Sequence, residues 1–164
     1  MLKNLLIVGA GQYGRVARDV AMSLQAYERI EFADDLSELA IYKIDEAKRL
    51  STELYGVFVA IGNPQVREGL VEEFSKLGFL VVRLISPYAW VSDSAAVADG
   101  CIVEPMAVVN SEAQLGRSTF ICAGAVVNHN ATVGDFCHCD CNSTVLARAC
   151  VPGKTKVLSG TVFS

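Results

Sequence analysis

The sequence predicts an α/β unit followed by an all-β parallel β-helix, because two different periodicities meet near residue 84. From Ile85 to Val157 an aliphatic or cysteine residue occupies every sixth position without a gap. The fourth place after each of these holds a residue no larger than threonine. Before residue 85, short apolar runs alternate with helical patterns. We therefore expect two domains, at residues 1–84 and 85–164.

The first domain should open with a strand, a tight turn and a helix. Lys3 to Val8 reads as a buried strand, residues 9–14 are rich in glycine, and Tyr13 to Leu24 carries apolar residues at helical spacing. A second strand is expected to end near Phe32, and a third to span Val57 to Ile61.

The remainder of this domain predicts one more helix and one more strand. Pro64 to Leu77 should be helical, with proline in the first turn, and Phe79 to Leu84 should form a fourth strand. Strands that alternate with helices in this way indicate a small, doubly wound Rossmann-like sheet.

Three loops of this sheet suggest a nucleotide site. Gly9, Gly11 and Gly14 lie between the first strand and its helix, where bare backbone lets a phosphate reach the helix amides. Close packing of helix on strand is the alternative reason for these glycines.

Polar residues follow the next two strands. Asp34 and Asp35 stand where carboxylates can accept hydrogen bonds from ribose hydroxyls, and Gly62 and Asn63 should open on the same crevice. A unit of about 84 residues is only half of a dinucleotide-binding domain. A small NAD-linked oxidoreductase is therefore the least favoured interpretation.

Charge and hydropathy exclude several classes of partner. The net charge of −4 is shared between the two halves, so neither offers a basic face to nucleic acid. No apolar run is long enough to span a membrane, and the apolar N-terminus leads into the glycine turn without a cleavage pattern. We expect a cytoplasmic protein that binds neither nucleic acid nor membrane.

All six cysteines lie in the repeat half, and we expect them to be free thiols. The cluster Cys137-His138-Cys139-Asp140-Cys141 would suit zinc by residue type. The repeat offers a simpler interpretation, because Cys137 occupies a small position and Cys139 an aliphatic one, so both should face the core. We therefore expect no metal.

The repeat also carries a family resemblance. Units such as Leu115 to Phe120 and Val133 to His138 resemble the hexapeptide repeats of left-handed β-helix acyltransferases, in which three units make one triangular coil. The whole chain is similar to the PglD and NeuD family of bacterial sugar acetyltransferases. The matching segments are GAGQYGR (9–15), FADD (32–35), AIGN (60–63), AVVNH (125–129) and GDFCH (134–138).

The resemblance implies the ligands and the assembly. Acetyl-CoA would be the co-substrate, and the first domain would hold a nucleotide-linked amino sugar, for example a UDP-amino-dideoxy sugar. Tyr13 would face that sugar at a position where relatives often have histidine. The family also implies a homotrimer with active sites between subunits.

Two histidines are the candidate catalytic groups. His129 and His138 lie outside the aliphatic and small positions, so both should face outward. Neutral imidazole can remove the proton of an amine as it attacks a thioester. The resemblance implies that His129 is this base and that His138 contacts the thioester end of acetyl-CoA. Ala147 would lie one coil beyond His129, where its amide could bind acetyl-CoA and stabilise the developing oxyanion.

Two features depart from the family. Asn130 follows the base where relatives place an acidic residue, and an amide can fix a tautomer but cannot stabilise imidazolium by charge. We expect a slower base unless Asp135 substitutes. The repeat phase breaks after Thr161, so the β-helix is expected to be short at its C-terminus.

These observations predict an acetyl-CoA-dependent N-acetyltransferase that acts on a nucleotide-linked amino sugar by direct transfer. Two alternatives remain open. One is a non-catalytic member that binds a nucleotide sugar or scaffolds a partner enzyme, and the other is a sugar O-acetyltransferase.

Overall fold

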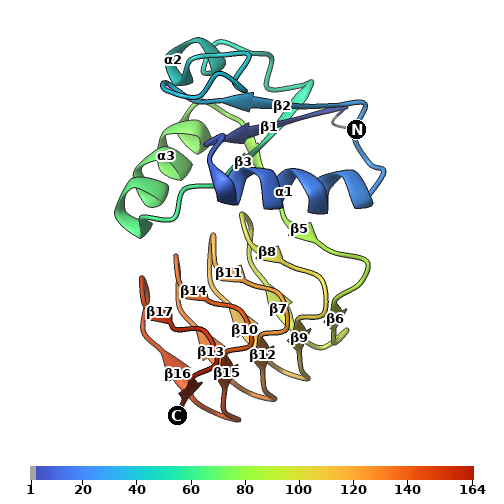
Figure 1. The fold of residues 1–164 in the computed structure, drawn as a ribbon, viewed down its shortest axis with the longest axis vertical. Coiled ribbons are helices and arrows are strands. Elements are labelled where there is room, and N and C mark those ends of the chain that lie inside the picture. Colours follow the sequence, from blue (N-terminus) through green and yellow to red (C-terminus); the bar gives the residue numbers. More distant parts are fainter. Residues whose placement is uncertain (1–2) are drawn as a thin grey trace. The chain divides into compact units, whose positions relative to one another are not determined.

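The computed structural model describes residues 3–164 (Figure 1). The chain divides into two compact units, Met1–Val82 and Arg83–Ser164. Each unit has its own hydrogen-bonded sheets and its own buried core.

The first unit is a parallel sheet of four strands in the order β2-β1-β3-β4. Helix α1 packs on β1 and β2, and α3 packs on β3 and β4. This is the predicted Rossmann-like arrangement. The elements are β1 Asn4–Val8, α1 Gln12–Ser23, β2 Arg29–Ala33, α2 Ile44–Ala47, β3 Tyr55–Val59, α3 Pro64–Lys76 and β4 Leu80–Val81.

Three details differ from the sequence-based prediction. Strand β3 begins and ends two residues earlier than expected, and the short helix α2 was not predicted. The expected strand Phe79 to Leu84 is divided, because Leu80–Val81 pairs with β3 whereas Leu84 pairs with Ile102 of the second unit. The apolar run across this point carries no turn signal, so hydropathy alone could not locate the break.

The second unit is a left-handed parallel β-helix of two-residue strands. Each strand from β5 to β15 pairs with the strand 18 residues further along the chain, so three hexapeptides make one coil (Figure 1). The strands form three sheets, β17-β14-β11-β8-β5, β18-β15-β12-β9-β6 and β16-β13-β10-β7. Their bounds are β5 Leu84–Ile85, β6 Trp90–Val91, β7 Ala96–Val97, β8 Ile102–Val103, β9 Val108–Val109, β10 Gln114–Leu115, β11 Phe120–Ile121, β12 Val126–Val127, β13 Thr132–Val133, β14 His138–Cys139, β15 Thr144–Val145, β16 Cys150–Val151, β17 Lys156–Val157 and β18 Val162–Phe163.

The two repeat positions build the core of the β-helix, as the period predicts. The aliphatic positions from Val103 to Val157 are buried, and small residues such as Ala107, Ala125 and Cys137 are buried beside them. β-Branched side chains pack well on such short strands, and small ones fit where the coil approaches its corner.

The corners of the triangular β-helix require backbone in the left-handed region of φ and ψ. Non-glycine residues there have φ between 56° and 64° at Met106, Asn142 and Arg148, for example, and Asn130 at φ 58° belongs to the same set. Side chains adopt this region at a cost, and asparagine tolerates it better than most residues do. The corner geometry therefore supplies a reason for asparagine at position 130 that is independent of catalysis.

Substitution of Gly14 tests how α1 packs on β1. A Cβ atom at this position would clash with the carbonyl oxygen of Gly9 and lie 3.4 Å from Cε1 of Phe32. We expect Gly14→Ala to lower the free energy of unfolding by roughly 2 to 3 kcal/mol, because neither backbone nor ring can yield freely. Chemical unfolding followed by circular dichroism measures the change.

Gly69 provides the matched control, since it lies in α3 and a Cβ there would meet nothing within 4 Å. Gly69→Ala should raise stability by about 1 kcal/mol because alanine is the better helix former. Equal effects of the two substitutions would contradict the packing described here.

Candidate functional site

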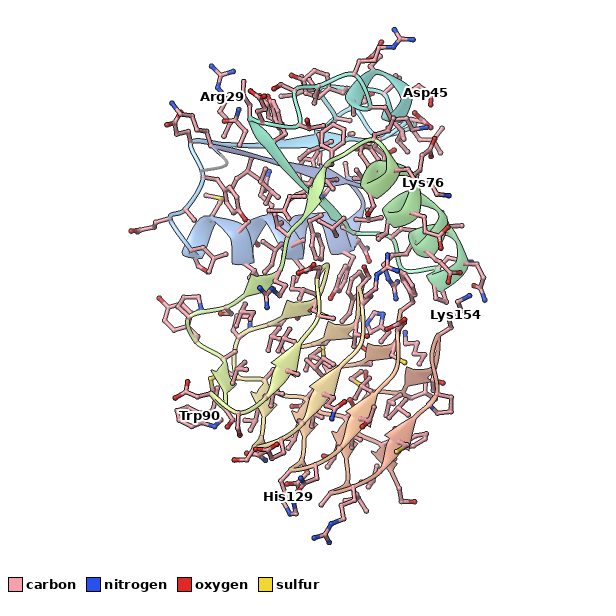
Figure 2. All side chains as sticks on the ribbon, turned by 180° about the vertical axis from the view of Figure 1, so that it is seen from behind. Arg29, Asp45, Lys76, Trp90, His129 and Lys154 are labelled. Atoms are coloured by element: carbon pink, nitrogen blue, oxygen red, sulfur yellow. The ribbon has the colours of Figure 1, made fainter. Side chains whose placement is uncertain are left out.

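His129 lies on a corner of the β-helix, in the turn that connects β12 to β13, and its side chain is exposed (Figure 2). Its backbone amide donates to Oδ1 of Asn128 at 2.8 Å. Its Nδ1 lies 3.1 Å from Oδ1 of Asn130. Because an amide oxygen only accepts, this contact puts the proton on Nδ1 and leaves the lone pair of Nε2 available to accept one.

The next coil stacks directly on this corner. Val127 pairs with Val145, and the amide of Arg148 donates to the carbonyl of His129 at 3.2 Å. Ala147 therefore lies one coil beyond His129, as the 18-residue count predicts. Asp135 belongs to a different corner, where its Oδ1 accepts from the amide of Arg117 at 2.7 Å. It is not positioned to replace an acidic residue after His129.

His138 lies on a different side of the β-helix, on β14. Its Nε2 is 3.1 Å from Sγ of Cys122, and its ring meets the ring of Phe120 edge-on with centroids 5.6 Å apart. The corner that carries His129 joins the other two sheets, so it lies opposite the sheet that carries His138. A single chain therefore does not bring the two histidines together.

The cysteines bear out part of the sequence interpretation. All six are free thiols. Cys137 and Cys139 face the core, and burial raises the pKa of Cys139 to about 12.

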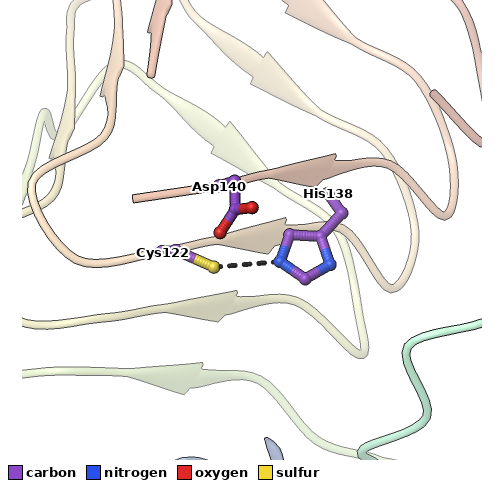
Figure 3. A group of neighbouring side chains, drawn as sticks. All are labelled: Cys122, His138 and Asp140. Carbon is purple, nitrogen blue, oxygen red and sulfur yellow. Dashed lines mark hydrogen bonds between the residues drawn. The ribbon is translucent and has the colours of Figure 1, made fainter. Parts of the chain in front are cut away.

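The structure instead gathers Cys122, His138 and Asp140 (Figure 3). Sequence analysis considered His138 and Asp140 for zinc within the cluster from Cys137 to Cys141, but it missed Cys122, which lies 18 positions before Asp140 and becomes its neighbour only through the coil register.

In the first unit, the three candidate loops leave one edge of the sheet. The ends of the strands are aligned there, since Val8 pairs with both Ala33 and Val59. Gly9 has φ 100°, and a Cβ on it would clash with Ile61. Gly11 caps α1 without a side-chain hydrogen bond. A turn of this kind leaves bare backbone at the helix N-terminus, as a phosphate site requires.

Asp34 acts as a brace between two of these loops. Its Oδ2 accepts from the amide of Ala10 at 2.9 Å, and its Oδ1 accepts from the amides of Leu36 and Ser37 at 2.8 and 3.0 Å. The bond from Ala10 is the main reason that the pKa of Asp34 lies below its usual value, and burial opposes it. The carboxylate therefore holds the crevice loops in place.

Asp35 and Asn63 also have structural partners. Oδ1 of Asp35 accepts from the amide of Ile44 at 3.0 Å. Oδ1 of Asn63 caps α3 by accepting from the amides of Gln65 and Val66 at 3.0 and 3.1 Å. Sequence reasoning assigned these residues to ligand contact and did not predict the capping.

Two further residues lie near this edge of the sheet. Tyr13 stands in the first turn of α1 and is half-buried. Arg67 is fully buried, and its Nη1 donates to the carbonyls of Ile61 and Gly62 at 2.6 and 3.1 Å. Sequence analysis missed Arg67, because an arginine in a helix pattern gives no sign that it turns back to the preceding loop.

A Rossmann-like unit together with a hexapeptide β-helix defines the class of two-domain, left-handed β-helix acyltransferase folds. The family described as the PglD N-terminal domain matches residues 4–74. The acetyltransferase domain of PglB from Neisseria gonorrhoeae FA1090, solved with acetyl coenzyme A, is 26% identical with a TM-score of 0.90. That match covers 100% of this chain and 92% of the other. The chain is therefore similar to the PglD-like sugar acetyltransferases, as its motifs predicted.

Two more distant relatives share features with the chain. A mutant of perosamine N-acetyltransferase from Caulobacter crescentus, in complex with CoA and GDP-perosamine, shares the fold at 22% identity and a TM-score of 0.84, over 100% of this chain and 90% of that chain. GDP-perosamine N-acetyltransferase from Escherichia coli O157:H7 is 24% identical over an alignment of 143 residues that covers 79% of this chain. The chain spans 64% of the length of that curated relative.

Across residues 3–164, none of the helices combines the length and the apolar character that crossing a lipid bilayer would demand.

Removal of the Asp34 carboxylate tests the brace. Asp34→Ala should lower the free energy of unfolding by about 1 to 2 kcal/mol at pH 7, since three amides lose their acceptor. Because folding lowers the pKa of Asp34, its contribution is present above the unfolded pKa and is lost as pH falls through the folded value. Urea unfolding at pH 7 and below pH 3 measures both effects.

Glu38→Ala serves as the control, because Glu38 is an exposed acid of the same loop. It should leave stability within about 0.5 kcal/mol of the parent protein. If Asp34→Ala lowered the free energy of unfolding by the same amount in acid as at pH 7, the result would contradict the electrostatic account.

Proposed function

We propose that this protein is an acetyl-CoA-dependent N-acetyltransferase acting on a nucleotide-linked amino sugar. The observation that carries the proposal is the exposed imidazole of His129, with Nδ1 held by Asn130 and Nε2 left to accept a proton. The similarity to the PglD-like sugar acetyltransferases supports it, and so does the acetyl coenzyme A bound to the N. gonorrhoeae relative.

The reaction is direct transfer, without an acetyl-enzyme. The amine nitrogen of the sugar attacks the thioester carbon while Nε2 of His129 takes the proton from that nitrogen. The amide of Ala147 donates to the oxygen that becomes negative as the carbonyl carbon turns tetrahedral. Collapse breaks the C–S bond, and the thiolate of CoA leaves and receives the proton that His129 had taken.

Asn130 orients this base. Its amide oxygen fixes the tautomer of His129 through the 3.1 Å contact, but it carries no charge to stabilise the imidazolium that forms. The same departure is the one feature that favours a non-catalytic, nucleotide-sugar-binding or scaffolding role. Acetyl-CoA binding with transfer supports the enzyme, whereas binding without transfer supports the scaffold.

The first unit would hold the nucleotide. The backbone around Gly9, Gly11 and Gly14 offers amides to a diphosphate, and Asp34 keeps that loop in position. Tyr13, Asp35, Gly62 and Asn63 would line the same edge. Two relatives carry GDP-perosamine in their names, so GDP-linked amino sugars should be assayed beside the UDP-linked ones that the family resemblance suggested.

The chain would act as a homotrimer. The outward row of the sheet β18-β15-β12-β9-β6 is mostly apolar, with Trp90 64% and Val162 62% exposed at its two ends. A second copy that covered this row would bury apolar surface. It could also supply the His138 that the His129 corner of a single chain does not reach. The free thiols and the use of acetyl-CoA suit the cytoplasm.

Two single variants test the assignment. His129→Ala should abolish acetyl transfer but leave nucleotide-sugar affinity nearly unchanged, because the base lies in a different unit from the nucleotide crevice. His138→Ala should weaken acetyl-CoA binding. Steady-state assays and calorimetry with each ligand measure these effects. Undiminished turnover by His129→Ala would refute the role of this base.

Mixed trimers of these variants test the shared site. When the two variants are unfolded together, refolded at equal amounts and assayed at limiting acetyl-CoA, where both are impaired, about a quarter of the sites should combine an intact His129 from one chain with an intact His138 from another. Activity should return to that extent. Absence of any recovery, with trimers formed normally, would show that each site uses the histidines of one chain.

A further inference from the structure

The hydrogen-bond register between adjacent coils brings three metal-ligating side chains together on the outer face of one β-helix sheet. His138 and Asp140 are two residues apart on one coil, and alternate residues of an extended strand share a face. Cys122 occupies the position of Asp140 on the preceding coil, since Phe120 pairs with His138 and Ile121 with Cys139. Adjacent coils are about 4.8 Å apart, so the three side chains converge.

The distances suit a small cation. Sγ of Cys122, a ring nitrogen of His138 and a carboxylate oxygen of Asp140 all lie within 4.8 Å of one another (Figure 3). The thiol and Nε2 of the imidazole are already 3.1 Å apart. Tetrahedral zinc with bonds of about 2.0 to 2.3 Å places its ligands about 3.5 Å apart, so small side-chain movements would complete the geometry.

The surroundings hold the three groups in place. Cys122 is 3% exposed, and the edge-on ring of Phe120 restricts His138. Burial acts to raise the pKa of Asp140, but hydrogen bonds from the Cys141 amide, Lys156 and Ser159 outweigh it and keep the carboxyl acidic. The group thus offers one anionic oxygen, one imidazole and one thiol that can ionise.

We propose that Cys122, His138 and Asp140 form a binding site for a borderline-soft divalent cation, zinc in particular. Sulfur, nitrogen and oxygen ligands together select zinc over magnesium or calcium, which prefer oxygen alone. Binding releases the thiol proton of Cys122 to solvent, so affinity rises with pH. Three protein ligands leave the fourth position to water.

Lys156 would compete with a bound metal ion for the carboxylate of Asp140. Its Nζ lies 3.2 Å from Oδ2 of Asp140, and its side chain is 54% exposed. A cation at the site displaces this ammonium group from the carboxylate, and the exposed side chain can swing into solvent. Removal of the lysine should therefore strengthen metal binding, whereas removal of any ligand should weaken it.

The full chain, first stripped with a chelator, is titrated with zinc against a chromophoric chelator and with cobalt for absorption spectroscopy. We expect one metal per chain and a thiolate-to-cobalt charge-transfer band. Cys122→Ser should abolish the band, and Cys122→Ser and Asp140→Asn should each weaken zinc binding by about tenfold or more. Lys156→Ala should tighten zinc binding severalfold.

Cys150→Ser is the matched control, because Cys150 is an exposed thiol on another sheet. It should leave the band and the affinity unchanged. Survival of the band in Cys122→Ser, with near-native circular dichroism, would overturn the proposal, as would its loss in Cys150→Ser. The measurement uses neither acetyl-CoA nor sugar, so its failure leaves the proposed enzyme activity standing, and the reverse also holds.

Discussion

The 18-residue hydrogen-bond register of the β-helix is the constraint on which the rest of the second unit depends. Backbone bonds such as Val126 N to the Ser143 carbonyl, at 2.9 Å, repeat from coil to coil. Because of these bonds, residues 18 positions apart in the sequence are neighbours on adjacent coils. The pairing of the Ala147 corner with His129 follows from this register, as does the meeting of Cys122 with Asp140. The separation of the two histidines follows from it as well.

The β-helix was predictable because its signal is repeated in every unit. An inward aliphatic residue and a small residue recur from Ile85 onward, and each repeat must fill the same narrow interior. The division of the strand predicted at Phe79 to Leu84 was not predictable, since an apolar run looks the same on either side of a domain break. Contacts between outward side chains were also hidden. They depend on which residues occupy the same position on neighbouring coils, and nothing in the sequence around Cys122 indicates its partners.

Polar residues near the candidate sites hold the local backbone or a neighbouring side chain in place, in addition to any contact that they make with a ligand. Asp34 holds the amide of Ala10, Asn63 caps α3, and Asn130 turns a corner while it orients His129. Residue types and spacing pointed to these positions but could not separate the two roles. The separation needs hydrogen-bond partners, and those come only from the folded chain. Loops of this kind can bind charged ligands without reorganisation because their own polar groups are already satisfied.

A cross-link between neighbouring coils measures the register directly. Thr132 and Cys150 are paired on adjacent rungs, whereas Gln114 lies one rung further from Cys150. A disulfide needs Cα atoms about 4.4 to 6.8 Å apart, which one rung allows and two rungs exclude. Under mild oxidation, Thr132→Cys should form an intrachain disulfide with Cys150, detected by peptide mass mapping, and Gln114→Cys should not. Cross-linking of Gln114→Cys to Cys150 instead, or equally from both positions, would contradict the 18-residue coil.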